Sequence, residues 1–322
     1  MFKHFFSIGT LIFLLSLVTV PAVPEPGPKT LSPKPPEEFV KLIFIHHSTG
    51  EAWLADYSGK LGATLKKNNY FVSDTNYGWG PDSIGDRTDI GYWWEWFNGP
   101  NRNTYLQALY TEYEKHSDYP RLSNDPGGEN DIIMFKSCFP NSHISGKPND
   151  KPTKGPNPLR GKDCYSSHHT VANVKDIYRD LLSYFKKHQE KLFIAILAPP
   201  LVEGGTDKAH AANARAVNNW LVKQWLKKYN KKYNNVRVFD FYNVLTSNGG
   251  NHNKHDAKKA KGNHHRLWKG KIQHIQTKNN NYSSYPIDEW DSHPTAAGGQ
   301  KASLEFIKLL NIWYKEWKTA KK

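Results

Sequence analysis

The sequence predicts an α/β protein, a three-layer α/β/α sandwich around a mainly parallel, five-stranded sheet. Five short apolar runs recur along the chain, as expected for strands buried on both faces. Amphipathic segments long enough to form crossover helices separate most of them, and such crossovers join parallel strands. Apolar residues make up 38% of the 322 residues, which is enough to fill a packed core.

Each element can be placed in chain order. Strands are expected over residues 39–47, 70–78, 130–138, 191–200 and 235–245. Helices are expected over 51–69, 170–188, 210–229 and 295–317. The segment 170–188 has the clearest helical pattern, because Val174, Ile177, Leu181 and Phe185 fall on one face. The fourth strand ends at two prolines, which cannot donate a backbone hydrogen bond to the sheet.

The first residues have the composition of an export signal. A basic start precedes an uncharged apolar run over 5–20, and Val20 and Ala22 fit a small-residue cleavage pattern. We therefore expect a signal peptide over 1–22 and a secreted or periplasmic, cell-envelope location. An uncleaved anchor is the alternative, since about 20 uncharged residues can span a bilayer.

The rest of the chain is expected to form one domain. Residues 23–38 are rich in proline and should form an extended linker. The domain should then cover 39–322, with long insertions at about 79–130 and 247–290. Insertions that follow strands tend to wall a ligand site, because open α/β sheets bind ligands beyond the carboxyl ends of their strands.

The charge is strongly basic, with 44 Lys and Arg against 30 Asp and Glu, a net charge of +14. The excess lies in short, scattered lysine runs, and no helix carries a continuous basic stripe. We therefore expect no specific nucleic-acid partner, although an anionic envelope surface could attract the chain. We expect a monomer.

Cysteines and histidines do not form a metal motif. The two cysteines, Cys138 and Cys164, could pair in an exported protein or remain free, and the sequence does not decide between these. Six histidines form three adjacent pairs: His46 and His47, His168 and His169, His264 and His265. Neighbours on a strand face opposite sides, so that one pair rarely supplies two ligands. The histidine-rich segment 252–265 is expected to be a solvated loop, and no metal or cofactor is expected.

A serine nucleophile is the leading interpretation of the segment that follows the first strand. Ser48 lies where a helix should begin, and there its hydroxyl can project over the edge of the sheet. The alternative is a helix cap. A serine needs a base, and His293 lies before the last helix at the same edge. Asp291, or Asp288 in reserve, could orient that histidine.

Asn141 follows the third strand after a short turn. A side-chain amide there can donate a hydrogen bond to an oxyanion, although asparagine is also common in turns.

The order of these motifs resembles the SGNH, or GDSL-type, hydrolase superfamily. The matches are Ser48 after the first strand, a glycine of NYGWG after the second, and Asn141 of SCFPNS after the third. Asp291 and His293 of DSHPTAAGG precede the last helix. The resemblance extends from Phe39 to Trp317. It implies a flavodoxin-like fold with a shallow esterase site that needs no metal, often acting on acyl or acetyl esters of carbohydrates.

The resemblance also implies residue roles. Ser48 would be the nucleophile, His293 the base and Asp291 its partner, with the Ser48 N–H, Gly80 and Asn141 as oxyanion donors. The chain departs from the family in two places. His46 and His47 replace the usual Gly-Asp before the serine, and the aspartate lies two residues before the histidine, where three is usual.

The tryptophan-rich first insertion has two interpretations. Trp79 and Trp94 could offer apolar faces on which sugar rings stack, or they could form a satellite core. The leading hypothesis is an exported serine esterase acting on a small ester or an acylated glycan. The alternatives are a non-catalytic glycan-binding protein on the same fold and an O-acyltransferase that uses the same residues.

Overall fold

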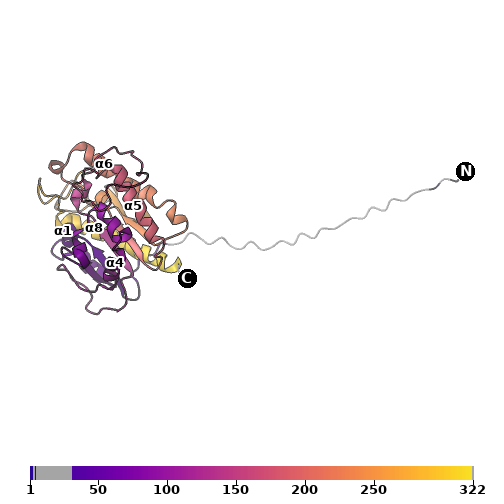
Figure 1. The fold of residues 1–322 in the computed structure, drawn as a ribbon, viewed down its shortest axis with the longest axis horizontal. Coiled ribbons are helices and arrows are strands. Elements are labelled where there is room, and N and C mark those ends of the chain that lie inside the picture. Colours follow the sequence, from indigo (N-terminus) through magenta and orange to yellow (C-terminus); the bar gives the residue numbers. More distant parts are fainter. Residues whose placement is uncertain (3, 5–30, 321–322) are drawn as a thin grey trace. The chain divides into compact units, whose positions relative to one another are not determined.

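The computed structural model describes residues 1, 2, 4 and 31–320 of the chain (Figure 1). The predicted signal peptide lies outside the described residues, apart from three isolated positions. The chain from Leu31 onward forms one compact unit. Among the helices that the structure describes, none is both long and apolar enough to cross a bilayer.

The sheet confirms the predicted fold class. All four strand pairs are parallel, and the strand order is β2-β1-β3-β4-β5. The strands are β1 (Val40–Ile45), β2 (Tyr70–Thr75), β3 (Ile132–Lys136), β4 (Leu192–Ile196) and β5 (Val236–Phe239). Every residue of the first four is buried, as expected for strands covered on both faces.

Helices cover both faces of the sheet and complete three layers (Figure 1). One core contains residues from α3 (Trp93–Asn98), α4 (Arg102–Thr111), α5 (Val171–Phe185) and α6 (Lys208–Trp220). The other contains residues from α1 (Ser48–Leu54), α2 (Leu61–Lys66), α7 (Phe241–Val244) and α8 (Ala296–Ala320). Alternate side chains of β1 enter the two cores, because successive strand residues face opposite sides.

Short elements fill the connections. They are the 3-10 helices η1 (Pro81–Asp86), η2 (Ile90–Tyr92), η3 (Phe139–Ser142), η4 (Glu203–Gly205) and η6 (Tyr229–Lys231), the π-helical turn η5 (Leu221–Trp225), and the hairpin β6 (His264–Trp268) with β7 (Lys271–Ile275). The helix expected over 51–69 is divided into α1 and α2. Gly59 lies in the break, where a side chain would meet the Trp53 carbonyl oxygen at 2.5 Å.

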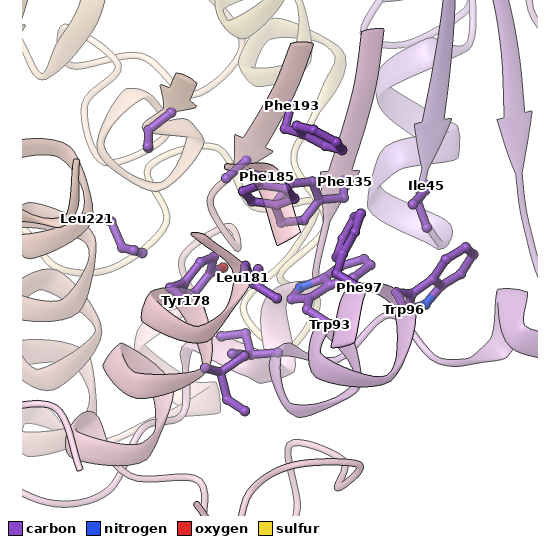
Figure 2. Packing of buried hydrophobic residues seen from close by; sticks show 14 of the residues in the cluster. Ile45, Trp93, Trp96, Phe97, Phe135, Tyr178, Leu181, Phe185, Phe193 and Leu221 are labelled. Atoms are coloured by element: carbon purple, nitrogen blue, oxygen red, sulfur yellow. The ribbon is translucent and has the colours of Figure 1, made fainter. Parts of the chain in front are cut away.

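The first insertion contributes to the main core. Figure 2 shows Trp93 and Phe97 of α3 against Phe135 of β3, with Phe185 and Phe193 next to them. The rings of Phe97 and Phe135 lie 5.5 Å apart, and those of Phe185 and Phe193 lie 4.2 Å apart. The insertion is therefore part of the fold that supports the sheet.

The described half of the predicted linker lies on the domain. The carbonyl oxygen of Pro33 accepts a hydrogen bond from the Asn311 side chain at 2.9 Å, and that of Pro36 accepts one from Asn69 at 2.8 Å. Leu31 packs against the core that contains α8. The folded region thus begins earlier than the predicted residue 39, because proline carbonyls can still accept hydrogen bonds.

The histidine-rich segment 252–265 is only in part the solvated loop that was predicted, because 252–254 and 258–261 are exposed in loops and turns while other residues are buried. His264 and His265 are buried in β6, where the His264 Nδ1 lies 2.7 Å from Glu305 of α8. Asp256, from the middle of the histidine-rich segment, is also buried. The prediction was wrong for these positions, because Asp256 and His264 find buried partners on α8.

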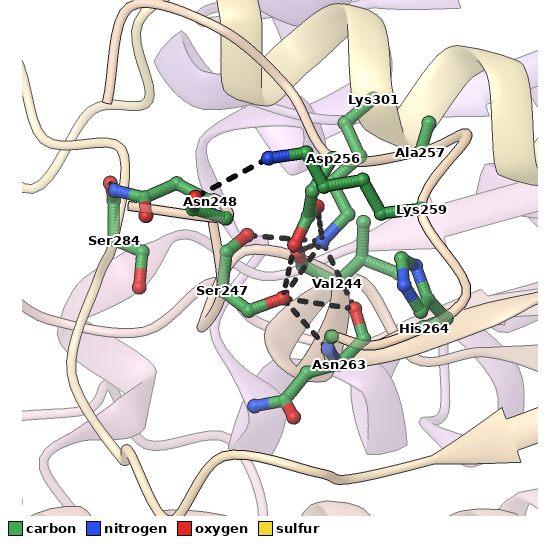
Figure 3. Close-up of polar contacts among 12 residues, drawn as sticks. Val244, Ser247, Asn248, Asp256, Ala257, Lys259, Asn263, His264, Ser284 and Lys301 are labelled. Carbon is green, nitrogen blue, oxygen red and sulfur yellow. Dashed lines mark hydrogen bonds and ion pairs between the residues drawn. The ribbon is translucent and has the colours of Figure 1, made fainter. Parts of the chain in front are cut away.

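Lys301 of α8 lies at the centre of the polar contacts between α8 and the second insertion (Figure 3). Its ammonium lies 2.6 Å from Asp256 Oδ1 and donates to the carbonyl oxygens of Val244, Ser247 and Asn263 at 2.7–3.0 Å. Both charged side chains are fully buried. This cluster fixes the insertion to the helix that follows His293.

Candidate active site

Ser48 begins α1 at the carboxyl end of β1 and is half-buried. Its Oγ lies 3.3 Å from the Cys138 Sγ, and the Thr49 Oγ1 lies 3.1 Å from the same sulfur. The residue at the helix cap is His47, in extended conformation, so that Ser48 does not act as the cap. The structure therefore gives the Ser48 hydroxyl a partner at the end of β3.

The histidines before Ser48 point to opposite sides of the sheet. The His46 Nε2 lies 3.0 Å from Asp74 Oδ2, with both side chains fully buried. The His47 ring stacks on Tyr77 at 3.8 Å and makes a hydrogen bond to Thr88. Burial lowers the pKa of His47. These two histidines are buried supports of the segment around Ser48.

His293 and Asp291 form a hydrogen-bonded pair in the loop before α8. The His293 Nδ1 lies 2.6 Å from Asp291 Oδ1, and its backbone N–H donates to the same oxygen at 2.8 Å. Burial raises the pKa of the Asp291 carboxyl, but the hydrogen bonds from His293 outweigh it, so that this pKa lies below its usual range. Asp288 accepts the backbone N–H groups of Trp290 and Asp291 and stabilises the turn.

The two segments meet at the turn after β3. Ser48 contacts Cys138, and the edge of the His293 ring contacts the ring of the next residue, Phe139, at 4.9 Å. Ser48 and His293 are not hydrogen-bonded to each other within the described chain. Both lie beside the dipeptide of Cys138 and Phe139, at the end of β3.

The predicted oxyanion donors differ in availability. The Gly80 N–H and the Ser48 N–H have no acceptor among residues 31–320, and Gly80 is exposed. The Gly78 N–H donates to Asp86 at 2.7 Å and is therefore occupied. Gly80 has a positive φ of 77°, a backbone conformation that favours glycine.

The expectation for Asn141 was wrong in this structure. The side chain is fully buried, its Oδ1 accepts the Ile90 N–H at 2.8 Å, and its Nδ2 donates to Asp89 at 2.5 Å. The amide therefore joins the first insertion to the turn after β3. It does not face solvent, because Asp89 offers a charged acceptor inside the protein.

Of the two interpretations of the tryptophans, the satellite core holds for Trp79. Trp79 is only 7% exposed, and its indole donates to Glu112 at 2.6 Å. One face of Trp94 lies under the Arg160 guanidinium at 5.3 Å. Trp290, next to Asp291, is instead 75% exposed. The buried tryptophans form core because this insertion has to fill the space beside β3.

A second serine, histidine and aspartate are linked by hydrogen bonds at the start of α6. The Ser145 Oγ lies 3.3 Å from His210 Nε2, and the His210 Nδ1 lies 2.5 Å from Asp207 Oδ2. Asp207 is 57% exposed and caps α6 by accepting the N–H groups of Ala209 and His210. Capping of α6 accounts for the position of the Asp207 carboxylate, and the Ser145–His210 contact is an exposed hydrogen bond beside it. Ser145 therefore provides a matched control for Ser48.

The structure brings together residues that sequence patterns did not identify. Cys138 and Cys164 are both free thiols, and Cys138 contacts the predicted nucleophile. Lys136, the last residue of β3, is fully buried behind Cys138. A lysine at the end of an otherwise apolar strand was the available signal. Of the described residues, Glu112, Glu114 and His116 have potential metal-ligand atoms near one another, but the Glu112 carboxylate already accepts hydrogen bonds.

No family model matches this chain, and no curated protein matches it. Among solved structures, the chain is similar to a family two carbohydrate esterase from Clostridium thermocellum that was solved in complex with cellohexaose. The match has a TM-score of 0.39 and 11% identity, and it covers 89% of this chain and 67% of that chain. A likeness this low says nothing about the activity of this chain.

Proposed function

We propose that this chain is a serine esterase that hydrolyses acyl esters. The observation that carries the proposal is the hydrogen-bonded pair of Asp291 and His293, which lies against the same turn as Ser48. A carboxylate that accepts the Nδ1 proton leaves the Nε2 of His293 free to act as a base. Ser48 is half-buried, so that substrate can reach it.

The reaction would proceed in two steps. The Ser48 Oγ forms a bond to the acyl carbon while His293 takes its proton, and the ester C–O bond breaks as His293 returns that proton to the leaving alcohol. Water then attacks the acyl-serine, and the carboxylic acid is released. The N–H groups of Ser48 and Gly80 are the candidate donors to the oxyanion. An acylated glycan remains the proposed substrate class, and export to the cell envelope remains a prediction.

The test is hydrolysis of a short-chain aryl ester by the wild-type chain and variants. Ser48→Ala should abolish turnover, while His293→Gln and Asp291→Asn should lower kcat by about a hundredfold or more. Ser145→Ala should leave the rate unchanged, because Ser145 contacts His210 and lies outside the proposed site. A fluorophosphonate probe should label Ser48.

Other outcomes would assign the chain differently. Labelling at Ser145 would move the nucleophile to α6 and overturn the proposed roles. Binding of an acylated glycan without turnover, unchanged in Ser48→Ala, would favour a glycan-binding protein. Transfer of the acyl group to an added sugar in preference to water would indicate an O-acyltransferase.

A further inference from the structure

The Cys138 sulfur lies among hydrogen-bond donors. The hydroxyls of Ser48 and Thr49 lie 3.3 and 3.1 Å from it, and the Thr49 backbone N–H also donates to it. A neutral thiol is a weak acceptor, whereas a thiolate accepts several hydrogen bonds strongly. A thiol could donate to only one of the two hydroxyls, so at least two of these three contacts are donated to the sulfur, and a thiolate would accept all three.

A buried cation lies on the same strand end. Lys136 is 0% exposed, and its Nζ donates to the Ser137 carbonyl oxygen at 3.2 Å. In the described part of the chain, no carboxylate lies within ion-pair distance of this ammonium. Lys301 is equally buried but is paired with Asp256 and surrounded by carbonyl oxygens (Figure 3). An unpaired buried ammonium is strongly unfavourable, so Lys136 either is neutral or pairs with an anion of another kind.

Lys136 and Cys138 face the same side of the strand end. The chain remains extended through Cys138, and alternate residues of extended chain share a face. Ser137, between them, faces the opposite side, where it accepts the Trp93 indole N–H at 2.9 Å.

The charges of the two groups favour each other. Burial raises the pKa of Cys138, but Lys136 and the hydrogen bonds from Ser48 and Thr49 outweigh it, so that this pKa lies below its usual range. Burial lowers the pKa of Lys136, and Cys138 opposes that change. Cys138 is thus the available counter-ion for the lysine.

We propose that Cys138 is a thiolate that pairs with the buried Lys136 ammonium and accepts the hydrogen bond of Ser48 in the resting chain, which makes it a positioning residue for the nucleophile. Relative to the neutral pair, the proton has moved from the sulfur to the Lys136 Nζ, and the net charge is unchanged. The thiolate holds Oγ at the end of β3, and the single hydroxyl proton passes to His293 when Ser48 attacks. This role rests on the proposed esterase function, but the ionisation of Cys138 does not.

Other titratable groups that face Cys138 are two tyrosines. Tyr77 follows β2, and Tyr165 precedes α5. Burial raises the pKa of Tyr77, and the neighbouring Cys164 raises the pKa of Tyr165. Both phenols are neutral near pH 7, so that Lys136 is the cation that sets the state of Cys138.

Thiol alkylation by iodoacetamide tests the ionisation without needing a substrate. Cys164→Ser leaves Cys138 as the target, and Cys138→Ser leaves Cys164, whose pKa is raised by burial and by Asp89. At neutral pH, Cys138 should react about tenfold faster than Cys164 or more. Lys136→Met should slow the labelling of Cys138. It should also shift the midpoint of the plot of labelling rate against pH to higher pH.

The labelling curve of the Cys164→Ser chain decides the ionisation even if Lys136→Met does not fold. A Cys138 midpoint at or above that of a free thiol, about 8.5, would overturn the thiolate. An unchanged midpoint in a folded Lys136→Met chain would overturn the pairing.

Ester hydrolysis tests the positioning role. Cys138→Ala should lower kcat about tenfold or more while KM changes little, because Oγ loses the contact that holds it in place for attack. The acid limb of the pH profile of kcat should follow the pH midpoint of Cys138 labelling in the wild-type and Lys136→Met chains. A low labelling midpoint with unchanged kcat in Cys138→Ala would overturn the positioning role. Absence of hydrolysis in the wild type would overturn the proposed function, while alkylation would still decide the state of Cys138.

Discussion

Removing the Lys301 ammonium should strongly destabilise the domain. Lys301→Met keeps an apolar stem of similar length but leaves the buried Asp256 carboxylate without its cation at 2.6 Å (Figure 3). Ser247 and Tyr285 still donate to that carboxylate, at 2.9 and 3.2 Å, so part of its solvation remains. Three carbonyl oxygens also lose a donor.

The magnitude follows from the burial of both charges. Removing one partner of a buried ion pair costs about 3–5 kcal/mol, and a domain is stable by only about 5–15 kcal/mol. With an m-value of about 3 kcal/mol per molar urea, the midpoint of unfolding should fall by about 1–1.5 M. Equilibrium urea unfolding followed by circular dichroism measures this shift.

Two matched variants separate the ion pair from general effects. Lys318→Met removes an exposed lysine that lies 3.5 Å from Asp131, and it should cost less than about 1 kcal/mol. Lys301→Met combined with Asp256→Leu removes both buried charges and should recover at least half of the loss. A loss below about 1 kcal/mol for Lys301→Met alone would refute the reasoning.

Two further predictions concern buried groups away from the nucleophile. Burial lowers the pKa of His265 to about 3, whereas an unfolded histidine has a pKa of about 6.5. The unfolded chain therefore binds a proton that the folded chain excludes, and stability should fall by about 3 kcal/mol from pH 6.5 to pH 4. His265→Gln should remove that part of the dependence in urea unfolding at the two pH values, and an unchanged dependence would contradict it. Trp93→Ala should cost about 3–5 kcal/mol by thermal unfolding, because the ring is fully buried and its N–H donates to Ser137. Trp290→Ala, at an exposed position, should change stability by less than about 0.5 kcal/mol, and equal losses would argue against the described core.

The strands were predictable because their signal is local. An apolar run such as that of β1 needs no knowledge of its neighbours to be recognised as a strand buried on both faces. The pair of His293 and Asp291 was also predictable, because the two residues are two positions apart and a short loop determines their geometry.

Asn141 and Trp79 show where such reasoning fails. Each was placed at the sheet edge correctly by its position after a strand. Whether its side chain faces solvent depends on partners elsewhere in the chain, Asp89 for Asn141 and Glu112 for Trp79. No pattern within a window of the sequence contains those partners. The burial of Asp256 and His264 depends in the same way on Lys301 and Glu305 of α8.

The sequence by itself determined the layers, the order of the strands along the chain and the residues offered at their carboxyl ends. Periodicity and chain order are enough for this, because they depend on neighbouring residues. Only the tertiary structure decided that the Ser48 hydroxyl meets the Cys138 sulfur, 90 positions away. That contact exists because β1 pairs in parallel with β3, which brings two distant strand ends to one edge of the sheet.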